Sequence, residues 1–406
     1  DDGTTGKNHD VWLSCYYIYD DLNRLRAVIQ PEGVKTLSGT SWTLTTTLLD
    51  EQTFRYEYDH RSRMIVKKVP GAGEVFMVYD KWDRLLLTQD AKQRPNYEYL
   101  FTKYDALNRP VMTGIYIFYG TIGEARDIAE TFAPYRFEER LSSGGIGSGY
   151  TTRCWPDVNI DILSATYYDD YGWLASQGNP LPSLRETTYD VYFKWPSNTV
   201  FPYPQSSVQS TMTKGMVTGT KTKVLGTSNY QFSVSFYDDK GRVIQQETKN
   251  HTGGKDIIST QYGWGGLPVV VVQKTDKGGS PYYVSEVATN YEYDALGRVV
   301  DIQKSVNTNV NGVWVSKPTQ SIAKQEYDAL GQLKKKILAP DYNDGDGLET
   351  LAYDYNIRGW LLGVNKKYIK NDNDSEYQPA YFGFELGYDK QTNNSVTNFY
   401  HVPQYK

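Results

Sequence analysis

One phrase recurs along the chain and limits what the chain can fold into. Its clearest copy is YEYDALGRV at residues 291–299. The two tyrosines alternate with Glu292, so both rings fall on one face of an extended strand. Asp294 opens a tight turn, because its short carboxylate can accept a backbone N–H two residues further on. Gly297 stands where a backbone with positive φ is easiest, so the phrase predicts one β-hairpin.

Variants of this phrase occur throughout the sequence, and internal repeats decide the fold before any other feature. A Tyr-Asp pair, once Tyr-Asn, opens each copy, and a Gly, Asn, Asp or Ser follows three residues later. Gly, Asn and Asp are the residues that best tolerate the left-handed region. The structural repeat turns that we assign contain Tyr19, Asp20, Asn23 and Arg24; Tyr58 and Asp59; Tyr79 and Asp80; Tyr104, Asp105 and Asn108; Tyr168, Asp169 and Gly172; Tyr237, Asp238 and Gly241; Tyr293, Asp294 and Gly297; Tyr327, Asp328 and Gly331; and Tyr355 and Gly359.

Tyrosine and glycine are abundant, with 36 and 35 copies among 406 residues, whereas methionine occurs five times. This composition favours short strands and turns over helices, so with the repeats it predicts an all-β fold of hairpins. We expect a repeat sheet at 1–120 and a second one at 236–406 that continues beyond the chain end. Between them, 121–235 is expected to be a less regular insertion that is continuous with the sheet.

The insertion contains the main helix that we expect. Thr121 and Glu124 form the pattern of a capping box, and apolar residues at helical spacing follow, so we predict a helix at about 122–133. Five prolines at 178–206 remove backbone donors, which predicts a sheet edge or a surface excursion. Residues 216–224 alternate well enough to be a half-buried hairpin.

Few residues point to catalysis, and we expect no catalytic, metal or cofactor site. The four histidines have no neighbours at the spacing of a metal site or a catalytic triad. The net charge of −5 is spread without blocks, which argues against a nucleic-acid partner. No run of about 18 apolar residues exists, so no membrane span is expected. The chain lacks a signal-peptide pattern and reads as a piece of a longer protein whose export signal lies elsewhere.

The repeat residues themselves leave alternatives open. The aspartates could pair as in glycoside hydrolases, but each already has a role in its turn. The arginines could lie over neighbouring tyrosine rings or be solvated, and we expect about half of them to lie over a ring. The tyrosine rings could contact sugars, or stack on one another and seal the sheet. Cys15 and Cys154 could form one disulfide, although two buried thiols are favoured.

The phrase Y-x-Y-D-x-x-G-R-L resembles the YD repeat of the Rhs family. That family includes bacterial polymorphic toxins, the C component of insecticidal ABC toxins, and teneurins. The resemblance covers most of the chain and is weakest from 121 to 235. Residues 58–73 and 355–361 look like the branch of the family found in outer-membrane bacteria that use type IX secretion.

The resemblance implies a long curved or spiralling β-sheet that forms a hollow shell around a C-terminal effector. It implies a structural, non-enzymatic role, with the rest of the Rhs chain and the effector as partners. It also implies an extracellular or outer-surface location on a Gram-negative bacterium. The alternative is a cell-surface binding protein or a secretion or motility component that contacts a protein or glycan. The family's self-cleaving segment contains Asp-Pro, which this chain lacks, so we assign no cleavage residue.

Overall fold

A computed structural model describes residues 13–131, 134–142, 147–369, 381–388, 390–392 and 399–401. The chain divides into two compact units, which are described separately. Unit 1 comprises Asp1–Pro180 with Gly219–Tyr230, and unit 2 comprises Leu181–Thr218 with Gln231–Lys406. The three-part division made from the sequence stays a prediction.

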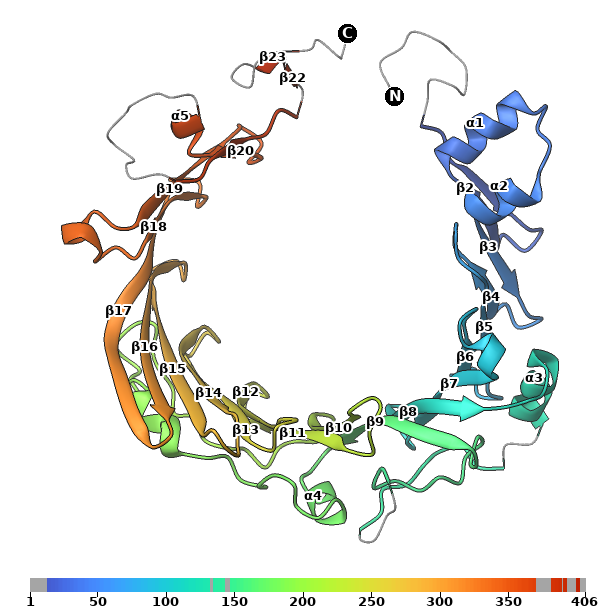
Figure 1. The fold of residues 1–406 in the computed structure, drawn as a ribbon, viewed down its shortest axis with the longest axis horizontal. Coiled ribbons are helices and arrows are strands. Elements are labelled where there is room, and N and C mark those ends of the chain that lie inside the picture. Colours follow the sequence, from blue (N-terminus) through green and yellow to red (C-terminus); the bar gives the residue numbers. More distant parts are fainter. Residues whose placement is uncertain are drawn as a thin grey trace. The chain divides into compact units, whose positions relative to one another are not determined.

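Unit 1 is built from antiparallel strands that follow one another in chain order (Figure 1). Strands β1 to β9 pair with their neighbours along the chain, and β10 pairs with β9. Its strands are β1 (Tyr16–Tyr19), β2 (Leu25–Ile29), β3 (Thr53–Tyr58), β4 (Met64–Lys68), β5 (Val75–Tyr79), β6 (Leu85–Gln89), β7 (Glu98–Tyr104), β8 (Pro110–Ile117), β9 (Ile160–Tyr168) and β10 (Val217–Lys223). Its helices are α1 (Pro31–Gly39), α2 (Thr46–Glu51), the 3₁₀ turn η1 (Arg94–Asn96), α3 (Ile122–Thr131) and α4 (Trp173–Ser176).

Unit 2 repeats the same architecture, with its longest strands between residues 283 and 327. From β11 to β21, each strand pairs antiparallel with the next. These strands are β11 (Tyr230–Tyr237), β12 (Val243–Lys249), β13 (Lys255–Tyr262), β14 (Pro268–Asp276), β15 (Tyr283–Tyr293), β16 (Val299–Val310), β17 (Val313–Tyr327), β18 (Leu333–Leu338), β19 (Glu349–Tyr355), β20 (Leu361–Val364) and β21 (Phe384–Glu385). The other elements are η2 (Thr188–Tyr192), η3 (Asn343–Gly345), α5 (Lys366–Ile369) and the separate hairpin β22 (Lys390–Thr392) with β23 (Phe399–His401).

The expected all-β fold of hairpins is therefore confirmed. Helix α3 is also where it was expected, and its capping box is formed. The Glu124 N–H donates to Thr121 Oγ1 at 3.2 Å, and the Thr121 N–H donates to Glu124 Oε2 at 2.7 Å. Residues 132 and 133, the end of the predicted helix, lie outside the described residues.

The expectation that helix is mainly confined to 122–133 was wrong, because α1 and α2 precede it. Helix α1 begins with Pro31, whose fixed φ suits the first turn of a helix. Val34 and Leu37 of α1 are buried with Ile29 and Leu48 in one cluster. Tertiary burial of this apolar stripe stabilises a nine-residue helix that would be marginal in isolation.

One face of the unit 1 sheet is covered by residues 134–142 and 147–157, which we call the first covering segment. Its anchor is Glu138, whose Oε1 lies 2.9 Å from Nζ of Lys103 on β7, and both side chains are fully buried. Lys103 also donates to the Cys154 carbonyl at 2.9 Å. The Glu138 carboxylate accepts three further hydrogen bonds, from Thr151 Oγ1 and from the backbone N–H groups of residues 153 and 154. The buried ion pair thus has all its polar atoms partnered.

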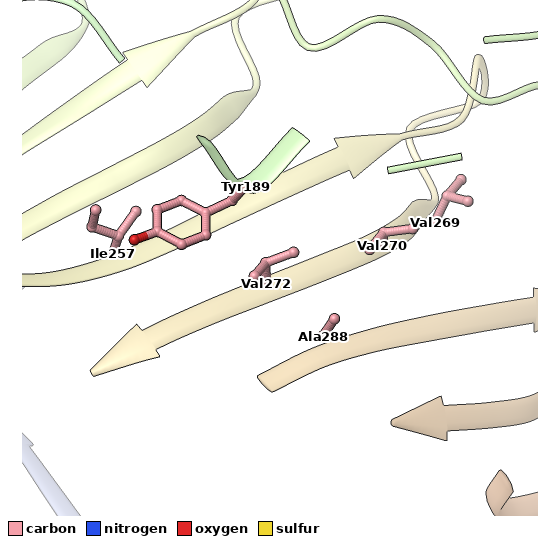
Figure 2. Packing of buried hydrophobic residues seen from close by; sticks show 6 residues of the cluster. All are labelled: Tyr189, Ile257, Val269, Val270, Val272 and Ala288. Atoms are coloured by element: carbon pink, nitrogen blue, oxygen red, sulfur yellow. The ribbon is translucent and has the colours of Figure 1, made fainter. Parts of the chain in front are cut away.

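The second covering segment, residues 181–210, lies on the sheet of unit 2. The expected surface excursion is therefore found, and it also packs onto the sheet, because Tyr189 of η2 is only 3% exposed. Figure 2 shows Tyr189 over the strands that carry Ile257 and Val272, and Val269, Val270 and Ala288 complete the cluster. The prolines do keep this segment out of the ladder, but its aromatic side chains cover apolar residues of the sheet.

Two buried glutamines hold the second covering segment by its backbone. Gln245 of β12 accepts from the Glu186 N–H at 2.6 Å and donates to the Glu186 carbonyl at 2.7 Å. Gln261 of β13 binds the N–H and carbonyl of Lys194 at 2.8 and 2.7 Å and the Gln205 carbonyl at 3.1 Å. Each side-chain amide thereby replaces a neighbouring strand as the hydrogen-bond partner.

Two smaller expectations are corrected by the structure. The hairpin expected at 216–224 is instead the single strand β10, which spans Val217–Lys223. Both cysteines are free, and Cys154 is buried as expected, but Cys15 is exposed. Burial raises the pKa of the Cys154 thiol to about 12.

Candidate functional site: the row of repeat turns

The turn that begins at Asp294 shows how the repeat closes a hairpin. Asp294 Oδ1 accepts the N–H groups of Leu296 and Arg298, both at 2.9 Å, and Oδ2 accepts Arg298 Nε at 2.6 Å. Gly297 has φ 78° and donates its N–H to the Asp294 carbonyl at 2.9 Å. The hydrogen bond from the Arg298 N–H is the main cause that holds the pKa of Asp294 below its usual value. The carboxylate is fully partnered by its own turn.

Five other turns repeat this ion pair. The distance from the arginine Nε to the aspartate Oδ2 lies between 2.6 and 2.8 Å in all of them. The pairs are Arg24–Asp20, Arg63–Asp59, Arg84–Asp80, Arg109–Asp105 and Arg242–Asp238. Since every one of these carboxylates is held by its own turn, they do not form the paired acids of a glycoside hydrolase.

A residue with positive φ stands at the third position after the aspartate. In unit 1 these residues are not glycines, whereas in unit 2 they all are. They are Asn23, Ser62, Asp83 and Asn108 in unit 1, with φ between 59° and 62°, and Gly241, Gly297, Gly331 and Gly359 in unit 2, with φ between 75° and 83°. Each such turn also carries a shift of register next to the repeat tyrosine, as in a β-bulge.

Two turns in unit 2 keep the backbone and lose the ion pair. Asp328 still accepts the N–H groups of residues 330 and 332, but Gln332 stands where the arginine would be. Asn356 replaces the aspartate and accepts the N–H groups of Arg358 and Trp360, both at 2.9 Å. The backbone hydrogen bonds are therefore sufficient to form the turn.

The copy at 168–172 does not form this turn, and the assignment of Gly172 as its left-handed residue is corrected. Gly172 has φ −62° and precedes α4, while Asp169 has φ 76°. The Asp169 carboxylate instead receives both terminal nitrogens of Arg109, at 2.9 and 2.7 Å. These hydrogen bonds are the main reason that the pKa of Arg109 is raised. Tyr168 ends β9 here, and no return strand follows directly.

Every repeat arginine lies over the tyrosine ring of the next copy of the repeat, where we expected about half of them to do so. The distances from the guanidinium carbon to the ring centroid range from 4.2 to 5.3 Å. The pairs are Arg24–Tyr58, Arg63–Tyr79, Arg84–Tyr104, Arg109–Tyr168, Arg242–Tyr262 and Arg298–Tyr327. The expected stacking of tyrosine on tyrosine occurs within one strand, between Tyr291 and Tyr293, whose ring centroids are 6.5 Å apart. Between these hairpins, the guanidinium lies on the ring.

Two hydrogen bonds add to this contact between hairpins. Arg63 Nη1 donates to the carbonyl of Asp80 in the next turn at 3.1 Å, and Arg24 and Arg242 make the equivalent bond. Most of the repeat tyrosine hydroxyls, though not that of Tyr79, in turn donate to a backbone carbonyl of the preceding strand, as from Tyr293 to the Pro268 carbonyl at 2.6 Å. Burial raises the pKa of Tyr293 to about 12. One Asp-Arg-Tyr set therefore closes a turn and joins it to the next hairpin.

Sequence reasoning missed one repeat, at residues 262–267. Tyr262 receives Arg242 at 4.8 Å and donates to the Val243 carbonyl at 3.1 Å, like most of the repeat tyrosines. Gly263 replaces the aspartate, Gly266 has φ 87°, and Leu267 replaces the arginine. The gap between the copies at 237 and 293, the longest in this half of the sequence, was the available signal.

No cation site or membrane helix appears in the part of the chain that the structure describes. There, no three His, Cys, Asp or Glu side chains are grouped closely enough to bind a metal ion. No helix in the same residues has the length and apolar character needed to cross a membrane. The chemistry of the turns is therefore that of ion pairs, stacked cations and hydrogen bonds.

Comparison with known protein families and with curated proteins finds no match for this chain. Comparison with solved structures finds similarity over 86% of the chain. A crystal structure of TcdB2-TccC3-TEV matches with 12% sequence identity and a TM-score of 0.35, and the match covers 15% of that chain. A structure of the Photorhabdus luminescens Tc holotoxin pore, with a mutated TccC3, matches with 12% identity and a TM-score of 0.21 over 21% of that chain. The chain thus spans about a fifth or less of the length of these chains.

Proposed function

We propose that this chain is a structural, non-enzymatic segment of a large secreted Rhs protein whose β-shell encloses a C-terminal effector. The observation that carries the proposal is the series of contacts in which each repeat arginine joins its own turn to the tyrosine of the next copy of the repeat. We call this series the relay. A wall of hairpins must resist shear between neighbours, and each arginine here joins its own turn to the next tyrosine. The YD phrases of the sequence support membership of the Rhs family and of its type IX secretion branch. The partners are then the remainder of the same chain and the effector, outside a Gram-negative cell.

A second candidate function is contact with a partner at the cell surface or in a secretion or motility complex. It is favoured by the outer side of the second covering segment, which exposes apolar residues while Tyr189 is buried below. Leu184 is 72% exposed, Val191 82% and Trp195 90%. The candidate function requires these exposed side chains to form one contiguous patch, because such patches are typical of interaction sites.

The shell hypothesis is tested on the full-length protein by limited proteolysis. The wild type is expected to release a C-terminal fragment only after the repeats are cut. Arg63→Ala combined with Arg242→Ala removes two links of the relay and is expected to make that fragment accessible early. Arg358→Ala is the matched control, because Arg358 lies over Trp360 of its own turn at 5.7 Å. A C-terminal fragment that is cut first in the wild type would contradict the enclosure of an effector.

A further inference from the structure

A pocket of about 470 Å³ lies in unit 2 between the second covering segment and two neighbouring turns. The segment contributes Pro196, Asn198 and Ser206, and the turns contribute Asp239, Lys240 and Trp264. We propose that this pocket binds a neutral carbohydrate, with Trp264 as the platform for a sugar ring. This site goes beyond the proposed shell function, which does not require it.

Trp264 stands at the tip of the repeat that lost its aspartate and arginine. The glycine before it is explained by packing, because a Cβ on Gly263 would lie 2.3 Å from the Pro202 carbonyl oxygen. The Trp264 N–H also donates to the Tyr203 carbonyl at 3.0 Å, so the backbone of this turn is fixed by the covering segment. Neither contact accounts for the indole, which is 62% exposed. A large rigid ring is thus presented to solvent on an anchored backbone.

Lys240 defines one side of the indole. Its Nζ lies 3.6 Å from the centroid of the Trp264 ring, which is a close cation–π contact. The ammonium group therefore covers one face of the indole and leaves the other face for a sugar ring. It has three N–H donors, and its contact with the ring uses none of them in a hydrogen bond to an oxygen or nitrogen atom. A pyranose combines an apolar face of C–H groups with a rim of hydroxyl groups. A pocket that combines an aromatic ring with an ammonium donor and a carboxylate fits both parts.

The charges of the pocket favour a neutral ligand. Arg242 is occupied, since it binds Asp238 through Nε at 2.7 Å and the Gly263 carbonyl through Nη1 at 2.9 Å. The two charges that remain, Asp239 and Lys240, are opposite in sign. An anion such as phosphate would therefore meet one carboxylate for each free cation. A few polar groups around an aromatic wall are instead typical of sites that orient an uncharged ligand.

Saturation-transfer NMR on the purified full chain tests this site with maltotetraose, cellotetraose and chitotetraose as probes. We expect saturation of at least one of them by the wild type, and binding weaker by about tenfold or more for Trp264→Ala. Trp314→Ala is the matched control, because Trp314 is 51% exposed on another hairpin, and it should bind like the wild type. Asp239→Ala, at an exposed position, should also weaken binding and guards against a folding defect in the tryptophan variant.

Three results would overturn the proposal. The first is no saturation of any of the three oligosaccharides by the wild type. The second is equal binding by the wild type and both pocket variants, provided that circular dichroism shows all of them folded. The third is that a proline-rich peptide binds through Trp264 while no oligosaccharide does, which would make the pocket a peptide site.

Discussion

The two covering segments solve the same problem with different chemistry. Each lies on one face of an antiparallel sheet and must satisfy polar atoms that it buries. The first uses a charged pair, Lys103 with Glu138, at 2.9 Å and without solvent exposure. The second uses uncharged amides, Gln245 and Gln261, which bind the segment's backbone.

This difference predicts how the loss of its anchor would affect each covering segment. A buried ion pair has a high desolvation cost, so removing one partner leaves an uncompensated charge in the core. A side-chain amide that binds backbone leaves only neutral groups behind, and water can reach them if the segment lifts. We therefore expect that removing the anchor of the first segment lowers global stability. Removing the anchor of the second segment should instead let that segment open locally.

The largest effect is expected for Lys103→Met. It leaves the Glu138 carboxylate buried without a cation, which should cost about 3–5 kcal/mol of unfolding free energy in urea titrations. Reaction of the cysteines with a thiol reagent reports the same event, because Cys154 is buried and Cys15 is exposed. Labelling of Cys154 should accelerate while that of Cys15 stays constant. Adding Glu138→Gln removes the stranded charge and should restore part of the stability; unchanged stability of the single variant would refute the charged anchor.

The next effect is expected for Gln261→Leu, which removes three hydrogen bonds to Lys194 and Gln205. Loss of these bonds should cost about 2–3 kcal/mol, mostly as local opening. Hydrogen exchange of residues 190–206 should speed up while that of unit 1 stays as in the wild type. Gln246→Leu changes an exposed glutamine of the same sheet and serves as the control. Equal exchange in both variants would mean that the amide does not hold the segment.

The turns extend the comparison, because unit 2 uses glycine where unit 1 uses larger residues. Gly297→Val places a β-branched residue at φ 78°, which should cost about 1–2 kcal/mol, whereas Gly297→Asn should be nearly silent. The rate of limited proteolysis near residues 290–300 compares the two variants with the wild type. In unit 1, Ser62→Gly should be neutral or slightly stabilising, since Ser62 has φ 62°. If the Val and Asn variants behave alike, the left-handed turn is not what limits this position.

A smaller effect is expected from the tyrosine hydroxyls. Tyr293→Phe loses the bond to the Pro268 carbonyl and should cost about 1 kcal/mol. Tyr79→Phe is the matched control in unit 1, because within the described residues that hydroxyl bonds the Met77 sulfur alone, at 3.7 Å. Its removal should change the unfolding free energy by close to zero. Urea titrations compare the two variants. An equal or larger loss for Tyr79→Phe would mean that the bond to the Pro268 carbonyl is not what makes the Tyr293 hydroxyl stabilising.

The smallest effect concerns Glu247, a buried carboxyl of β12 that lies 3.0 Å from Lys255. Burial raises its pKa in the folded chain, so its contribution to stability is present in acid and is lost as pH rises through that pKa. Glu247→Gln removes this loss and should slightly stabilise unit 2 at neutral pH. Denaturant titrations from pH 4 to 8 should show that the variant's unfolding free energy exceeds that of the wild type by an amount that grows with pH. A difference that shrinks as the pH rises would mean that the ion pair with Lys255 stabilises the charged carboxylate by more than its burial destabilises it.

The sequence by itself determined the hairpins and most of their turns. Each turn is closed by atoms within five consecutive residues, as between Asp294 and Arg298, so the local sequence carries the needed information. The capping box of α3 is local in the same sense. Where a repeat lost its marker residues, as at 262–267, or kept them without the turn, as at 168–172, the sequence alone misled us.

Only the tertiary structure decided how hairpins are joined and what covers them. The contact of Arg109 with Tyr168, at 4.2 Å, links residues 59 positions apart in the sequence, and no local pattern encodes that distance. The burial of Tyr189 on Val272 and the anchoring of Lys194 by Gln261 likewise arise only when the segments meet in space. Burial and hydrogen-bond satisfaction depend on neighbours brought in by the fold, whereas turn geometry depends on the residues of the turn itself.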